Sequence, residues 1–272
     1  MPDPRRRSMT DMSIRMPEAL PLPVPAELMA LVRDNAEITR GEGLAMIERA
    51  VAKDPSAKFA ALLAVLKLLA FGRTEQNLAL MADENPKIDC AMGCAACCHQ
   101  NVDVTVPEAI LISLRLADPD DPRRAAILET SDWYSRQPAE TQWRVGRACP
   151  LLEEQRCSVY EDRPLVCRSV LSPDAKGCHA ALKSAIEGGD PVATATYPLP
   201  QFLTRGDQAA VQGICKDLGL QHDVVDLVQA LALILSDPTA IDRWSEGQTV
   251  FEPRPVRDAI DPRQLVAEAA PA

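Results

Sequence analysis

Aromatic residues are scarce in this chain, and their scarcity counts against a sheet-rich core. Phe, Trp and Tyr make up 4% of the 272 residues, whereas hydrophobic residues as a whole reach 47% and include many Ala and Leu. Ala and Leu favour helix, while strands are enriched in aromatic and β-branched side chains. A chain of this length also buries a substantial core without needing disulfides. We therefore expect a mainly α fold.

Positive charge is in short supply as well. Acidic side chains outnumber basic ones by 39 to 29, which gives a net charge of −10. Such a chain repels nucleic acid and anionic lipid unless its basic residues gather in one patch. The dense basic run is Arg5, Arg6 and Arg7, which lies near the N-terminus beside prolines. We expect no nucleic-acid partner.

Long hydrophobic runs are missing too. The most apolar segment, residues 59–72, is too short to span a bilayer and carries Lys67 in its middle. A secretory signal would need an apolar stretch after the N-terminal arginines, but charged residues and prolines interrupt residues 9–25. We therefore expect a cytoplasmic protein with no membrane partner. In that reducing compartment, grouped cysteines usually bind metal or carry out redox chemistry.

The chain divides into five parts. Residues 1–25 predict a disordered tail. Residues 26–84 predict a helical segment, in which one helix begins after Pro25 and two more lie within 41–70, separated near Asp54. Residues 85–185 form the cysteine-cluster metal-binding domain, with helices from Val106 and from about Asp121. Residues 186–250 are helical again, notably over 222–237, and 251–272 form a polar tail. The predicted architecture is thus mainly α, with helical flanks around a loop-rich core and little β-structure.

Eight of the nine cysteines lie in that central part, in two groups. The first group has the spacing C-x3-C-x2-C-C, which puts its sulfurs on one face if the backbone is helical, although a loop around an ion would serve equally. Gathering several thiolates without a cation is costly, and a metal removes that penalty. Zn²⁺ takes four ligands and cubane iron-sulfur clusters take four thiolates, so two four-ligand sites or one site with spare thiols are both open. The groups are Cys90, Cys94, Cys97 and Cys98, and Cys149, Cys157, Cys167 and Cys178.

Three arginines accompany the second group, namely Arg156, Arg163 and Arg168. We predict that they donate hydrogen bonds to thiolate sulfurs, and surface ion pairs with nearby carboxylates are the alternative. For Tyr160 we favour a core aromatic over a sulfur hydrogen-bond donor.

The order of these residues resembles the YkgJ-like cysteine-cluster family, which is named for a proposed chelation of zinc or iron. The resemblance rests on C-x3-C-x2-C-C, then CPLL, then C-x-V-Y-x2-R-P-x2-C-R, and it covers about residues 88–180. It implies that Tyr160, Arg163, Pro164 and Arg168 are signature neighbours of the cluster. A related cluster in flagellin lysine methylases keeps iron-sulfur chemistry open. The metal ligands so implied, with Cys178 as the eighth, are Cys90, Cys94, Cys97, Cys98, Cys149, Cys157, Cys167 and Cys178.

Other uses of the cysteines fit less well. Cys90, Cys94 and Cys97 alone match the radical S-adenosylmethionine signature, but the repeated strands of a (β/α) barrel do not follow. A disulfide scaffold would need an oxidising compartment and would strain the adjacent pair Cys97 and Cys98. His99 is a less favoured ligand than the cysteines. His179 and His222 read as ordinary surface or core histidines, and Cys215 as a small buried side chain.

Three function classes follow from the cluster. We favour a metal-binding protein that chelates zinc or iron, with the metal ion as its partner and its biological role unassigned. The alternative is an iron-sulfur redox protein or enzyme, and a metal or redox sensor is the third class. The sequence contains no nucleophile and base pair, phosphate-binding glycine loop or paired His-Glu zinc motif, so no reaction is assigned.

Overall fold

The computed structural model of the protein describes residues 26–72, 75, 79, 87–137, 147–187 and 194–254. Of these residues 66% are helical and 5% lie in strands, which confirms the predicted mainly α fold. The predicted tail 1–25 lies outside the described residues, as do residues 255–272. Within the described ranges, no helix combines the length and the apolar character needed to cross a membrane.

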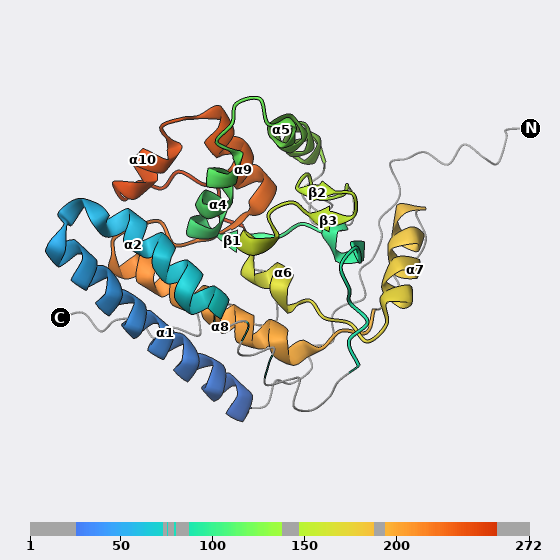
Figure 1. Ribbon diagram of the computed structural model, residues 1–272, viewed down its shortest axis with the longest axis horizontal. Coiled ribbons are helices and arrows are strands. Elements are labelled where there is room, and N and C mark those ends of the chain that lie inside the picture. The colour runs from blue at the N-terminus through green and yellow to red at the C-terminus, as the bar shows by residue number, and fades with distance from the viewer. Residues whose placement is uncertain are drawn as a thin grey trace, which may run out of the picture.

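Three helices from the two ends of the chain form one layer (Figure 1). Helix α1 (Ala26–Lys53) packs along α8 (Pro198–Asp217) and α2 (Lys58–Val65). The short 3-10 helix η1 (Pro55–Ala57) separates α1 from α2 beside the capping residue Asp54, so the predicted break is confirmed there. A π-helical turn, η2 (Leu66–Phe71), extends α2.

The structure corrects the predicted helix count in this layer, because α1 is continuous where two helices were expected. Gly41 and Gly43 lie inside it, and Gly43 marks the contact with α8. A Cβ at Gly43 would stand 2.6 Å from Ile214 Cδ1. Gly206 on α8 likewise faces α1, since a Cβ added there would lie 2.9 Å from Val32 Cγ1 and 3.1 Å from Val32 O. The glycines therefore allow α1 and α8 to pack closely.

A second group of helices packs beside this layer. Helix α9 (Leu227–Ser236) contacts α4 (Val106–Ser113) and α5 (Pro122–Ser135), and α10 (Ala240–Ser245) follows it. A 3-10 turn, η4 (Leu114–Leu116), extends α4. The helices predicted from Val106 and from about Asp121 are thus confirmed.

Two three-residue strands join the cysteine segment to the C-terminal helices. Strand β1 (Asp103–Thr105) pairs antiparallel with β4 (Val224–Asp226), with Val104 opposite Val225. Each strand runs directly into a helix, because a capping box of Thr105 and Glu108 starts α4 and the Asp226 side chain caps α9. The predicted helix over 222–237 therefore begins later than expected, and its first residues are a strand.

One hydrophobic core runs through all of these parts. It contains Ile47 from α1, Leu165 from the cysteine segment and Leu231 from α9. Phe251 belongs to it and is 2% exposed, so the folded chain continues past the predicted start of the C-terminal tail at residue 251. The cysteine segment is therefore built onto the helical body and shares its core.

Candidate metal centre

The first cysteine group lies in a loop and a short 3-10 helix. Residues 90–95 form a loop with a turn at Met92 and Gly93, where Gly93 has a φ of 90°, a left-handed conformation that favours glycine. The 3-10 helix η3 (Ala96–His99) then carries Cys97 and Cys98. The first group therefore lies in a loop and a 3-10 turn, and not along one face of an α-helix.

The second group is held by a tight hairpin and a short helix. Strands β2 (Leu152–Glu153) and β3 (Arg156–Cys157) pair across Glu154 and Gln155, both of which have positive φ. The 3-10 turn η5 (Tyr160–Asp162) leads to helix α6 (Leu165–Ser169), which carries Cys167. Cys149 precedes the hairpin, and its N–H donates to the carbonyl oxygen of Cys98 at 2.7 Å. This bond joins the two groups directly.

A third segment brings Cys178 to the outer side of the first group. Helix α7 (Ala175–Ile186) carries Cys178 and His179 in its first turns and packs against η3. Ser172, in the loop before α7, donates its N–H to Cys90 Sγ at 3.2 Å, and the Cys178 thiol donates to Ser172 Oγ at 3.4 Å. His179 Nε2 lies 3.8 Å from Cys94 Sγ.

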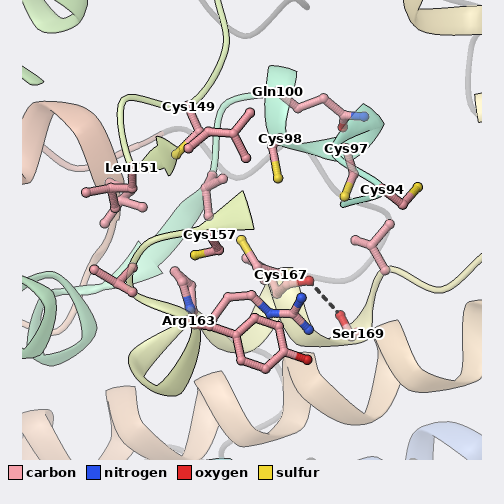
Figure 2. A pocket seen from close by; sticks show the side chains of 18 of the residues that line it. Cys94, Cys97, Cys98, Gln100, Cys149, Leu151, Cys157, Arg163, Cys167 and Ser169 are labelled. Carbon is pink, nitrogen blue, oxygen red and sulfur yellow. Dashed lines mark hydrogen bonds between the residues drawn. The ribbon is translucent and has the colours of Figure 1, made fainter. Parts of the chain in front are cut away.

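A cavity of about 410 Å³ opens between the two cysteine groups. Figure 2 shows Cys98, Cys149, Cys157 and Cys167 around one space, with Cys94 at the edge of the group. Among the other side chains that line the cavity are Arg163 and Gln100. The cysteines in its wall are Cys94, Cys97, Cys98, Cys149, Cys157 and Cys167.

All nine cysteines of the chain are free thiols. Two findings would have ended the metal interpretation, namely distant cysteine segments or sulfurs tied up in disulfides, and the structure has neither. In the described ranges, however, no three His, Cys, Asp or Glu side chains stand close enough together to hold an ion. The ligand set therefore stays a prediction.

For five of these thiols, the surroundings raise the pKa and so favour the protonated form. Burial raises the pKa of Cys149 to about 11, and burial together with neighbouring thiols raises the pKa of Cys167 well above its ordinary value. The pKa of Cys97 is raised first by its hydrogen bond with Cys98 and then by burial. Burial also raises the pKa values of Cys90 and Cys157. Several thiolates in this cavity therefore need a positive charge among them.

The three arginines play different parts. Arg163 stacks over the Tyr160 ring at 4.9 Å, and its buried Nε has no hydrogen-bond partner in the described part of the chain. The pKa of Cys97 is raised mainly by its hydrogen bond with Cys98, and the pKa values of Cys157 and Cys167 mainly by burial; the positive charge of Arg163 offsets part of each rise. An unpartnered N–H beside sulfurs suits a bond to a thiolate, so the hypothesis stands for Arg163.

Arg168 departs from the prediction. Its Nε and Nη2 donate to the carbonyl oxygens of Arg163 and Glu161 at 2.8 and 2.6 Å, and its guanidinium lies over the Phe71 ring. It therefore holds the turn before α6 and gives these donors to backbone. Arg156 lines the cavity from the exposed strand β3.

Several single-residue predictions are also settled. Tyr160 is 61% exposed, so the core assignment was wrong. Cys215 is 1% exposed, as predicted for a small buried side chain. His99 Nδ1 lies 3.1 Å from Ala95 O, while His179, which we read as ordinary, lies beside Cys94. In the sequence, the feature that could have marked His179 as a candidate ligand is its position directly after Cys178.

Comparison with known proteins agrees with this geometry. Searches of curated proteins and of solved structures found no match. Residues 89–183 match the CxxCxxCC family, described as "Putative zinc- or iron-chelating domain". The match falls within the predicted cysteine domain 85–185, and this chain has three residues between Cys90 and Cys94 where the family name has two. The cysteine-lined part of the protein is therefore similar to this family, and the similarity is limited to residues 89–183.

Proposed function

We propose that this protein binds zinc or iron through thiolates of its cysteine cluster, and that the bound metal organises the loop-rich part of the domain. The observation that carries the proposal is the meeting of two sequence-distant cysteine groups, all free, around one cavity. The proposed ligands are Cys90, Cys94, Cys97, Cys98, Cys149, Cys157, Cys167 and Cys178.

The residues present fit such an ion. The donor set is thiol sulfur, which suits Zn²⁺ and iron better than the hard cations that prefer oxygen. The unpartnered Arg163 Nε supplies a donor for a thiolate, and the hydrogen bond between Cys149 and Cys98 holds the two groups together without metal. Zinc here would stabilise the fold, by about 10 kcal/mol for a structural site, whereas iron would add electron transfer.

An iron-sulfur cluster is the second candidate, and the number of cysteines around the cavity favours it. The wall of the cavity contains more than the four cysteines that a cubane cluster uses. In this version the domain carries electrons or serves an enzyme. Both versions need the reducing conditions of a cytoplasm to keep the thiols available.

The test is metal and acid-labile sulfide analysis of protein purified without oxygen. Stoichiometric zinc, or iron without sulfide, supports the first proposal, and iron with a comparable amount of sulfide supports the second. Protein that retains neither metal, and takes up neither on reconstitution, refutes both.

A pair of variants locates the binding. Cys149→Ala removes a cavity thiol and should reduce the bound metal. Cys215→Ala, in the core of α8 away from the cavity lining, serves as its control and should leave the metal content unchanged.

A further inference from the structure

The eight clustered cysteines fall into two spatial sets. Cys97, Cys98, Cys149, Cys157 and Cys167 all line the cavity, whereas Cys90 and Cys178 do not. Cys90 and Cys178 are joined instead through Ser172, on the side where α7 packs against η3. Cys94 lies between the sets, and Figure 2 shows its side chain at the edge, away from Cys149 and Cys157.

We propose that Cys90, Cys94 and Cys178 bind a metal ion of their own at the edge of the cavity, and that His179 is its fourth ligand. This inference rests on the proposed function and deepens it, because it divides the cluster between two sites and adds a ligand that is not a cysteine. The outer site is defined as these four residues, and the inner site as the five cavity cysteines that remain.

The distance between Cys94 and His179 suits a shared ion. With Zn–S of about 2.3 Å and Zn–N of about 2.0 Å, tetrahedral angles separate a sulfur and a nitrogen ligand by roughly 3.6 Å. Cys94 Sγ and His179 Nε2 lie 3.8 Å apart. Because His179 follows Cys178 on α7, the helix that presents one thiol also presents the imidazole.

Ser172 is placed to support two thiolates of this site. Its backbone N–H already points at Cys90 Sγ at 3.2 Å, a contact that favours the ionised sulfur. Its hydroxyl oxygen accepts from the Asp174 N–H at 3.0 Å, which leaves the hydroxyl hydrogen free to donate to Cys178 Sγ once that thiol has lost its proton. Metal-bound thiolates are commonly fixed by such donors from an outer shell.

The backbone around the outer site is already fixed. Asp89 donates its N–H to Ser172 O at 2.9 Å, and the Asp174 side chain caps α7 by accepting from the Gly177 N–H at 2.8 Å. In the described residues these side chains do not yet stand close enough together to hold an ion, so the proposed site requires them to turn toward one another on binding.

Ligand number also favours the division. The inner site retains five thiols without Cys90, Cys94 and Cys178, which is enough for a tetrahedral ion or a cubane cluster.

The test counts metal in purified protein with Zn²⁺ or Co²⁺ alone as the probe. The wild-type chain should bind ions at two sites. His179→Ala should weaken one of them by at least about 100-fold, more than the 10- to 100-fold typical of losing an outer-shell partner. His179→Cys should restore it, with the Co²⁺ spectrum shifted from mixed sulfur and nitrogen coordination toward sulfur alone. His222→Ala is the control and should bind as the wild type does.

The outcomes separate the two proposals. Wild-type protein that binds no zinc, cobalt or iron defeats the proposed function itself. Wild-type protein that binds metal, while His179→Ala keeps the same number of ions and the same Co²⁺ spectrum, overturns the outer site alone. If the protein has a single metal site that Cys149→Ala abolishes and His179→Ala leaves intact, the outer site alone is again overturned.

Discussion

A buried carboxylate connects the helical body to the cysteine segment, and its removal should measurably change the stability of the protein. Glu108, in the first turn of α4, is 1% exposed. One of its oxygens accepts from the N–H and the hydroxyl of Thr105, both at 2.8 Å, and the other accepts from the N–H of Leu165 at 2.8 Å. Leu165 is the first residue of α6, the helix that carries Cys167. The bond to Leu165 thus ties α6 to the helical body.

We predict that Glu108→Gln lowers the free energy of unfolding by about 1–3 kcal/mol, because the amide must turn its NH2 toward one of these donors and leave it unpaired. Burial raises the pKa of Glu108, which means that its buried negative charge is itself unfavourable. Removing that charge in Glu108→Gln therefore offsets part of the loss of stability. Glu108→Ala leaves all three donors without an acceptor and should cost more, about 3–5 kcal/mol.

Urea unfolding of the metal-free protein measures both variants. With a slope of about 2–3 kcal/mol per molar urea, the midpoint of Glu108→Gln should fall by roughly 0.5–1 M, and that of Glu108→Ala by more. Glu129→Gln is the matched control, since Glu129 is 69% exposed and pairs with Arg147 at the surface, and it should change stability by less than about 0.5 kcal/mol. Equal midpoints for Glu108→Gln and the wild type would refute the reasoning.

Three further predictions concern packing, pH and the arginine beside the sulfurs. Gly206→Ala should destabilise the protein by about 1–3 kcal/mol, because the new Cβ meets the backbone of α1, whereas Gly41→Ala has open space and should stabilise it by about 0.5–1 kcal/mol; thermal unfolding distinguishes them. Metal-free protein should lose stability as the pH rises from about 9 toward 11, since the raised pKa of Cys149 lets the unfolded chain release that proton first, and melting at about pH 8 and pH 10.5 would detect this. A constant melting temperature over that window would contradict it. Arg163→Gln should lower metal affinity by about 10- to 100-fold in a competition titration with a chelator, with unchanged helicity. Arg136→Gln, at the exposed end of α5 and outside the cavity lining, should change it little.

The sequence predicted the helices because they follow from local information, and the grouping of the cysteines pointed to a bound cation. Apolar spacing and capping residues are enough to place α4 and α5. The electrostatic cost of clustered thiolates predicts a cation among them, and the structure brings the backbones of Cys98 and Cys149 into direct contact.

What the sequence left out depends on contacts between distant residues. Strands of three residues show no periodic pattern, so the pairing of Val104 with Val225 had no local signal, and β4 was read as helix. Gly41 and Gly43 suggested a helix boundary, whereas the close approach of Ile214 explains why Gly43 sits inside one helix. His179 gained its significance only when α7 was placed beside Cys94.

The charge distribution of the cavity explains why the flanking helices matter to the metal centre. Asp103 and Asp226, one on each strand of the β1–β4 pair, lie at the cysteine side of the body, and Asp226 contributes to the raised pKa of Cys149. Arg254 holds both carboxylates, with Nε 2.7 Å from Asp103 and Nη1 2.5 Å from Asp226. Because this arginine is already committed to them, it offers little charge to the thiols, and ionising those thiols would leave the cavity strongly negative. The C-terminal flank therefore supports the cysteines structurally and supplies little positive charge, so the proposed bound cation, together with Arg163, would have to balance any thiolates formed there.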